Sequence, residues 1–420
     1  MKITSLTSRQ ILDSRGHPTI ETTVLVDIGV SGTAAVPSGA STGSHEAVEL
    51  RDDNPRDYNG QSVHNAVSNV TGIIAKALTG TDVRDQRAID RHMIELDGTM
   101  NKAKLGANAM LSVSLAVARA HAALDRQPLY RSLQESFGFP QIRPKKLPRP
   151  MMNVLNGGRH ADNGLKVQEF MVIPDGATVA TRVARGVDVY HALGKILHEQ
   201  KLSTLLGDEG GYAPRLSSER AALDLLVKAT KAAGYTMPKQ VALGLDLAAS
   251  EFYNAGTGRY DFGETDGGLA SVGMIGTVQE WLRHYPLLSI EDPLAEDDWE
   301  AWTDLTATVP VGTLLVGDDL FATNKSRLDR GIDAKAANAI LIKVNQIGTL
   351  TETMDTILRA QEAGYAVIIS HRSGETTDSF IADLAVAVGA PWLKAGAPAR
   401  GERVAKYNRL LAIEEELLGK

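Results

Sequence analysis

The second half of the chain repeats one pattern, a short apolar run that stops at a charged or polar residue. The runs cover residues 241–245, 287–290, 311–316, 339–342, 366–369 and 392–393, and helical patterns such as 219–233 and 350–363 lie between most of them. Strands that alternate with helices predict a parallel sheet. Six or more such units predict a (β/α)8-type barrel, with functional residues at the carboxyl ends of its strands.

The first 140 residues have a mixed pattern. Residues 19–28 alternate apolar and polar side chains, as a half-buried strand does. Helical periodicity follows over 62–78, 86–96 and 107–124. The last of these is apolar around most of its circumference, which predicts a buried helix. We therefore expect a smaller α+β domain in this part of the chain.

A proline-rich segment separates the two patterns. Residues 143–150 hold three prolines, and proline both restricts its own φ and disfavours helix at the residue before it. We predict an α/β protein of two domains, an α+β N-terminal (capping) domain over residues 1–140 and a β/α barrel with the catalytic site over 141–420.

Composition narrows the possible functions. The formal net charge of −7 argues against nucleic acid as the primary ligand. The chain has no cysteine, which excludes disulfides, thiolate catalysis and Cys-ligated zinc. We expect no membrane span, because no run of about 18 apolar residues occurs. Residues 1–15 lack the apolar core of a signal peptide, so we expect a cytoplasmic protein, with an additional surface or secreted pool left open.

Three carboxylates follow the predicted strands. Asp246, Glu291 and Asp318 each stand at or just after the end of an apolar run. If these strands are neighbours in a barrel, the acids converge, and like charges in a partly buried site need a cation. Oxygen ligands favour Mg²⁺ over zinc. Any one of them alone is as readily a solvated loop acid or a helix N-cap.

A lysine ends another of these runs. Lys343 has apolar neighbours on both sides, and a desolvated lysine has a lowered pKa and can act as a general base. The alternative is a lysine whose stem is packed and whose ammonium reaches water. With three acids beside it, Lys343 becomes the natural base for a proton alpha to a carboxylate.

A second acid lies in a glycine-rich loop, Gly207-Asp-Glu-Gly-Gly211. Glycines let a tight loop present a carboxylate without side-chain crowding. Glu209 is therefore a candidate for the acid that protonates a leaving hydroxyl, and Glu169 is placed to assist it. An exposed acidic turn is the ordinary alternative.

Several cationic and polar residues suit a phosphate. His371, Arg372 and Ser373 follow one strand, and Lys394 ends the next. A guanidinium, a hydroxyl and loop amides bind phosphate oxygens well, although Arg372 or Lys394 alone is equally an ordinary surface cation. His160 lies in a glycine-rich loop that is more often a plain turn. No nucleotide-binding glycine motif, H-E-x-x-H or G-x-S-x-G occurs, so Ser38 to Gly43 is interpreted as a mobile flap.

Long, ordered motifs in both halves resemble the enolase family over nearly the whole length of the chain. They include Ile11-Leu-Asp-Ser-Arg-Gly16, Val36-Pro-Ser-Gly-Ala-Ser-Thr-Gly43, Gly207-Asp-Glu-Gly-Gly-Tyr-Ala-Pro214, Ser289-Ile-Glu-Asp-Pro293, Ile340-Leu-Ile-Lys-Val-Asn-Gln346 and Ser370-His-Arg-Ser-Gly-Glu375. The resemblance implies a glycolytic lyase that reversibly dehydrates 2-phosphoglycerate to phosphoenolpyruvate, by proton abstraction with a lysine base and a magnesium-stabilised enolate. It also implies a barrel whose opening is not uniformly βα.

The resemblance also assigns roles to residues. It implies a first Mg²⁺ held by Asp246, Glu291 and Asp318, and a second joined by Ser41 as the flap closes. It implies Lys343 as the base at C2 and Glu209 as the group that helps expel the C3 hydroxyl. The residues implied to position substrate and phosphate are His160, Glu169, His371, Arg372, Ser373 and Lys394.

Some positions depart from the family pattern. Ala412 stands where an arginine is common, and that arginine often pairs across a subunit interface with the acid at Glu21. The absence of this arginine weakens the expectation of a homo-oligomer, either a dimer or an octamer of dimers. Ala395 and Gly401 replace the usual threonine and serine near Lys394. Two rivals stay open, an enzyme of the same superfamily acting on another carboxylate and a binding or scaffold protein.

Overall fold

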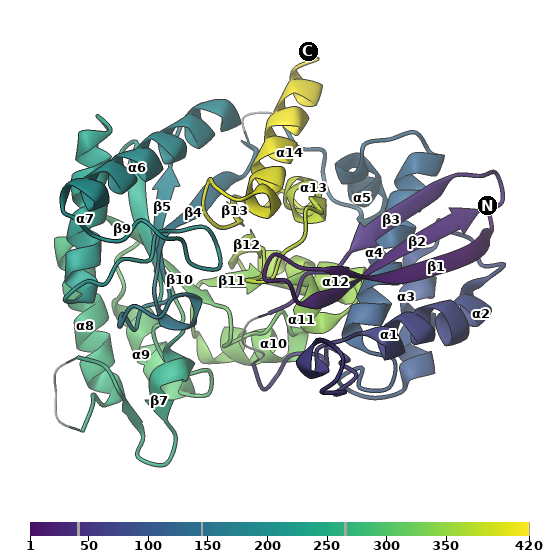
Figure 1. Ribbon diagram of the computed structural model, residues 1–420, viewed down its shortest axis with the longest axis horizontal. Helices are drawn as coiled ribbons and strands as arrows, with labels where there is room; N and C mark the ends of the chain where they lie inside the picture. Colours follow the sequence, from purple (N-terminus) through teal and green to yellow (C-terminus); the bar gives the residue numbers. More distant parts are fainter. Residues whose placement is uncertain (40–42, 144–145, 264–266, 420) are drawn as a thin grey trace.

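The computed structural model describes residues 1–39, 43–143, 146–263 and 267–419. Residues 36–43 include the expected flap, and its Ser41 lies outside the described residues. Figure 1 shows two parts side by side, a small sheet with helices around the N-terminus and a barrel ringed by helices.

The N-terminal part is a three-stranded antiparallel sheet packed on helices. Its strands are β1 (Ile3–Leu12), β2 (Pro18–Val26) and β3 (Ser31–Ala35), in that order across the sheet. The helices are α1 (His64–Asn69), a π-helical turn (Val70–Ile74), α2 (Ala75–Leu78), α3 (Gln86–Asp97), α4 (Ala107–Leu124) and α5 (Leu129–Phe137), with a short 3-10 turn at Tyr58–Gly60. The helix predicted over 62–78 therefore contains a π-helical turn, while α4 is buried over most of its length, as its composition predicts.

The C-terminal part is a closed barrel. Among the described residues its strand order is β10-β11-β12-β13-β4-β5-β6-β9. The strands are β4 (Arg149–Asn156), β5 (Glu169–Pro174), β6 (Val241–Asp246), β9 (Leu287–Glu291), β10 (Leu314–Gly317), β11 (Ala339–Ile342), β12 (Ala366–Ser370) and β13 (Trp392–Lys394). The predicted α/β barrel beside a smaller α+β part is thus confirmed.

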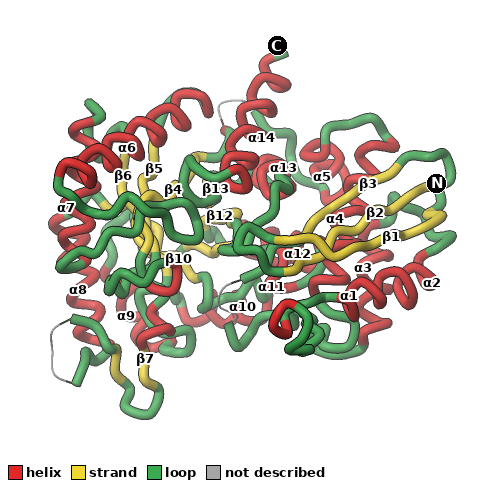
Figure 2. The backbone as a smooth tube through the Cα atoms, in the orientation of Figure 1, coloured by secondary structure: helices red, strands yellow, loops and turns green. Residues whose placement is uncertain are grey.

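Helices surround this barrel, as the backbone trace in Figure 2 shows. They are α6 (Val179–Glu199), α7 (Glu219–Ala232), α8 (Ser271–His284), α9 (Trp299–Thr308), α10 (Lys325–Ala334), α11 (Val344–Ile347), α12 (Leu350–Glu362), α13 (Phe380–Ala387) and α14 (Gly401–Leu418). Short 3-10 turns at Gly158–His160 and Ala249–Phe252 and a hairpin of β7 (Tyr253–Asn254) and β8 (Arg259–Tyr260) lie in the loops.

One strand of the barrel runs against the others. β5 is antiparallel to both β4 and β6, whereas the remaining neighbouring pairs are parallel. The barrel opening is therefore not uniformly βα, as expected. Because β5 is reversed, its first residue, Glu169, lies beside the last residues of its neighbours, Asn156 and Asp246.

The predicted strand over 311–316 is shorter in the structure. Val311 is fully exposed in a turn, and β10 begins only at Leu314. The turn is closed by a hydrogen bond from the Thr313 amide to the Pro310 carbonyl, and Gly312 has a φ of +93°. Apolar residues in a turn are indistinguishable from a strand by composition alone.

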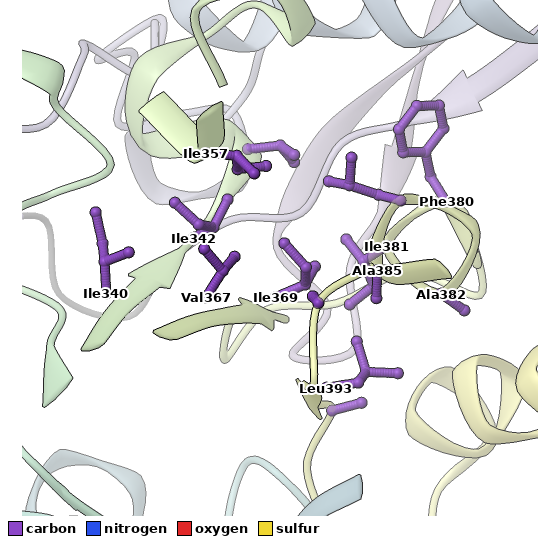
Figure 3. Close-up of a cluster of buried hydrophobic side chains, with 14 of the residues drawn as sticks. Ile340, Ile342, Ile357, Val367, Ile369, Phe380, Ile381, Ala382, Ala385 and Leu393 are labelled. Carbon is purple, nitrogen blue, oxygen red and sulfur yellow. The ribbon is translucent and has the colours of Figure 1, made fainter. Parts of the chain in front are cut away.

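Apolar side chains project from both faces of the barrel wall. One cluster fills the interior and includes Met151, Met171, Leu341 and Ile368. The other lies between the strands and the outer helices, and Figure 3 shows part of it, where side chains of β11, β12 and β13 pack against those of α12 and α13. Each fully buried large aliphatic side chain contributes about 1.5–3 kcal/mol of transfer free energy, so this double packing holds the strand ends in place.

Candidate active site

The three predicted acids meet at one end of the barrel. Asp246 ends β6 and Glu291 ends β9, and the two residues are directly paired across these strands. Asp318 follows β10, the next strand in the barrel. All three carboxylates are buried. The prediction that separate stretches of chain bring these acids together agrees with the geometry.

Lys394, at the end of β13, lies among these acids. Its Nζ is 2.8 and 2.9 Å from the two carboxylate oxygens of Glu291, 3.2 Å from Asp246 and 3.1 Å from Glu169. Burial alone lowers the pKa of this ammonium, but the carboxylates of Glu169, Glu291 and Asp246 outweigh burial and raise its pKa well above the usual value. Lys394 is therefore charged and balances the acids of the site.

Lys343 forms an ion pair with Asp318, whose other oxygen accepts a hydrogen bond of 3.0 Å from the Gln346 amide. Burial lowers the pKa of the Lys343 ammonium, yet the adjacent Asp318 carboxylate raises it by more, so the net pKa lies above the usual value. The lowered pKa expected from the sequence is wrong for this arrangement. Apolar neighbours in sequence do not reveal a carboxylate that arrives from another strand.

Glu209 lies across the same site, in contact with two histidines and an amide. Asn153 Nδ2 donates to Glu209 Oε2 at 2.9 Å, His371 Nε2 lies 3.5 Å from the same oxygen, and His160 Nδ1 lies 3.7 Å from Oε1. The loop needs its glycines, since a Cβ on Gly207 would come within 2.6 Å of the His160 carbonyl.

Glu209 and Glu169 have opposite protonation tendencies. Burial raises the pKa of Glu209, but His371 and His160 lower it by more, so its pKa lies well below the usual value. Burial and the charge of Glu209 raise the pKa of Glu169 well above the usual value. The two carboxylates lie close together, within one group of atoms spanning 4.8 Å, so they titrate as a pair.

Arg372 is anchored by a residue from the N-terminal part. Its Nη1 lies 2.8 Å from Glu46 Oε2 and 3.0 Å from Asn345 Oδ1. The next residue, Ser373, is also buried. Sequence reasoning missed Glu46, and no local signal marks it, because its partner is more than 300 residues away in the chain.

Nearly all the predicted side chains line one polar pocket. The pocket is lined by Glu46, His160, Gln168, Glu169, Glu209, Asp246, Ala248, Asp292, Asp318, Asp319, Lys343, Ser370, His371, Arg372, Ser373 and Lys394. Glu291 is not among these lining residues and is fully buried against Lys394. Ser41 is outside the described residues.

Two further acids of the site, Asp292 and Asp319, were not predicted from the sequence. Carboxylate oxygens of Asp292, Asp318 and Asp319 lie within 4.8 Å of one another. Burial and the charge of Asp319 raise the pKa of Asp292, and burial together with Asp318 raises the pKa of Asp319 to about 8. Both residues directly follow a predicted acid in the sequence, so adjacent acid pairs at strand ends were the available signal.

The donor set fits a hard divalent cation. Asp246, Glu291 and Asp318, like Asp292 and Asp319, offer carboxylate oxygens alone, and such ligands suit Mg²⁺. A second group of atoms able to hold a metal ion joins His160, Glu169 and Glu209. Burial and then the charges of neighbouring carboxylates raise the pKa of Glu291 and of Asp292, and a bound cation would offset both effects.

The fold and the site define a TIM-barrel enzyme with clustered acids, a buried lysine (Lys394) and a partly buried lysine (Lys343) at the carboxyl end of its strands. The chain matches two family models, "Enolase, N-terminal domain" over residues 3–133 and "Enolase, C-terminal TIM barrel domain" over residues 144–420. The chain therefore belongs to the enolase family, and its domains are those of a lyase of the enolase type. Within the described residues, no helix has both the length and the apolarity needed to cross a membrane.

Proposed function

We propose that this chain catalyses the reversible dehydration of 2-phosphoglycerate to phosphoenolpyruvate. One observation carries the proposal: Lys343, the Glu169–Glu209 pair and Arg372 all line one polar pocket. Removing water across C2 and C3 needs a base, a proton source and a cationic anchor for phosphate.

We assign the first cation site to Asp246, Glu291 and Asp318. We further propose two Mg²⁺ ions per active site, with Ser41 as a ligand of the second. A divalent cation held by these residues would supply positive charge beside the substrate carboxylate and so acidify the C2 proton. Asp318, as one of its ligands, would then be drawn away from Lys343. The pairing of Asp246 with Glu291 across adjacent strands supports this assignment.

Lys343 is the proposed base. Once its ion pair with Asp318 is released, burial is the remaining strong influence on its ammonium, and burial lowers its pKa. A lysine that is neutral in this pocket accepts the C2 proton.

The Glu169–Glu209 pair is the proposed proton source for the departing C3 hydroxyl. Glu209 lines the pocket between His160 and His371, and Glu169, whose pKa burial and the charge of Glu209 raise well above the usual value, is the proposed holder of the proton. In this proposal the proton passes from Glu169 to Glu209 and from Glu209 to the hydroxyl as the C3–O bond breaks, so that water leaves, and His160 positions the pair.

Phosphate recognition is assigned to Arg372, Ser373 and His371. The guanidinium of Arg372 is a planar donor fork that matches an anion, and Glu46 holds it in place. Lys394, placed among the carboxylates, is better suited to the substrate carboxylate and to charge balance than to phosphate.

Absorbance at 240 nm during incubation with 2-phosphoglycerate and Mg²⁺ tests this function. We expect a rise that stops on adding EDTA and returns with excess Mg²⁺. The matched control is the same acid without its phosphate, which should react far more slowly. A chain that turned over the unphosphorylated acid equally well, or neither acid, would refute the proposal.

The proposal extends to the pathway, the cellular location and the oligomeric state of the protein. A role in glycolysis and gluconeogenesis, a cytoplasmic location and a homo-oligomer follow from the proposed activity and the family, and they stay predictions. The division of the chain at residues 140 and 141 is likewise kept as a prediction.

A further inference from the structure

Arg403 is a fully buried arginine outside the predicted site. It lies in the first turn of α14, and its side chain is 0% exposed. Burying a guanidinium is costly unless its donors are satisfied. The hydrogen-bond partners of Arg403 therefore indicate its role.

Those partners belong to the loops of the pocket. Arg403 Nη1 contacts His371 Nδ1 at 2.6 Å and donates to the Arg372 carbonyl at 2.6 Å. Its Nη2 donates to the carbonyl of Ser373 and, at 3.2 Å, to that of Asp208. One side chain therefore joins the loop that carries His371 to the loop that carries Glu209.

The contact with His371 also determines where its proton lies. A guanidinium has N–H donors and no acceptor, so His371 Nδ1 must accept and be unprotonated. A neutral ring then carries its proton on Nε2. That nitrogen is buried, has no hydrogen-bond partner of ordinary length, and lies 3.5 Å from Glu209 Oε2.

We propose that Arg403 is a positioning residue that holds His371 as the Nε2–H tautomer and directs that N–H at Glu209. The tautomer is a property of the fold, and its effect on turnover rests on the proposed function. Arg403 acts through His371 and does not itself line the pocket.

The charge environment agrees with a neutral ring. Burial lowers the pKa of His371 well below its usual value, and the positive charges of Arg403 and Lys394 add to this effect against the opposing charge of Glu209. The Nε2–H of His371 then points its positive end at the Glu209 carboxylate 3.5 Å away, and the proton for the leaving hydroxyl comes from the Glu169–Glu209 pair.

Nitrogen-15 NMR of histidine side chains in the full chain tests the tautomer directly. The chain has 10 histidines, and the signal lost in His371→Gln assigns this ring. In the wild-type protein we expect a protonated Nε2 and an unprotonated Nδ1. A proton on Nδ1 would overturn the proposal, whether or not any Arg403 variant folds.

Arg403→Met then tests the cause. Methionine keeps much of the volume and removes every donor, so we expect the Nδ1–H tautomer of His371 to become populated. Arg409→Met is the matched control, because Arg409 lies on the same helix and pairs with Asp383 and Glu416 instead. A folded Arg403→Met protein with an unchanged tautomer contradicts the proposal.

Kinetics separate positioning from general damage. For Arg403→Met we expect kcat to fall about 10²-fold, as for a misplaced catalytic group, with little change in KM, and Arg409→Met to retain both. Equal losses in the two variants would overturn the positioning role. If the wild-type chain does not dehydrate 2-phosphoglycerate, the proposed function fails, while the NMR result still decides the tautomer.

Discussion

The lysines and the carboxylates in this pocket balance one another's charge. Lys394 contacts Glu169, Asp246 and Glu291, and Lys343 pairs with Asp318. An uncompensated buried carboxylate is strongly unfavourable, so each lysine stabilises the acids before it can act on a substrate. The same pairing explains why Lys343 has a raised pKa in a site where a base needs a lowered one.

Replacing Lys343 by alanine should abolish both turnover and exchange of the C2 proton with solvent, because both require the same base. A loss of at least about 10²–10⁴-fold is typical for removing a general base. Exchange is followed by NMR of 2-phosphoglycerate in deuterated water, with Lys325→Ala, an exposed lysine on α10, as the control. Exchange at the normal rate in Lys343→Ala would assign the base elsewhere.

Glu209→Gln should slow dehydration more severely than C2 exchange, because a neutral amide keeps the shape of the side chain and loses its proton transfer. The two rates are compared in one sample, by absorbance at 240 nm and by deuterium incorporation. Glu199→Gln, at the exposed end of α6, is the control. Equal losses of both rates would count against the separate roles of Lys343 and Glu209.

The elements of the barrel decide which residues meet. Because β5 runs opposite to its neighbours, Glu169 reaches the site from the start of a strand, while Asp246 and Glu291 reach it from strand ends. The helix α14 contributes at two points, through Arg403 near its start and through Glu414 near its end. Glu414 accepts hydrogen bonds from the amides of Val179 and Ala180 in the first turn of α6, at 2.6 and 3.2 Å.

Glu414→Ala should therefore destabilise the protein without changing the site. Its carboxylate satisfies unpaired amides at a helix N-terminus and favours the helix dipole, an effect of about 1–2 kcal/mol. Chemical unfolding followed by circular dichroism measures the loss, and Glu415→Ala, an exposed neighbour, is the control. Equal stability of the two variants would show that the cap contributes nothing.

On the scale of the whole molecule, the N-terminal part completes the pocket of the barrel. Glu46 holds Arg372, and the backbone of Ser38 pairs with that of Gly374 through hydrogen bonds of 2.7 and 2.9 Å. Arg119 of α4 binds Asp378, ahead of α13, through two hydrogen bonds of 2.6 and 2.7 Å. The two parts are thus linked both at the pocket and away from it, through Arg119 and Asp378.

Mg²⁺ should raise the melting temperature of the whole chain, because a ligand that binds only the folded state stabilises it. At a concentration 100 times its Kd the gain is about 2.7 kcal/mol. Calorimetry with and without EDTA measures the shift, and Asp318→Asn, which removes one proposed ligand, should reduce it. An equal shift from sodium chloride at matched ionic strength would indicate screening and no specific site.

Much of the fold was predictable because the apolar runs are local signals. The runs ending at Asp246, Lys343 and Lys394 each became a barrel strand, and the apolar helix at 107–124 is buried. The helix at 62–78 and the strand at 311–316 were predicted too simply, since a π-helical turn and an exposed apolar turn leave no distinct pattern.

The amino-acid sequence by itself determined the strand and helix pattern, the reactive residue types at the strand ends and the motifs of the family. Only the tertiary structure decided the reversal of β5, the pairing of Glu46 with Arg372 and the contact of Arg403 with His371. It also decided the direction in which the pKa of Lys343 shifts. The physical reason is that a strand or helix follows from neighbours along the chain, whereas charge balance depends on groups that meet only after the barrel closes.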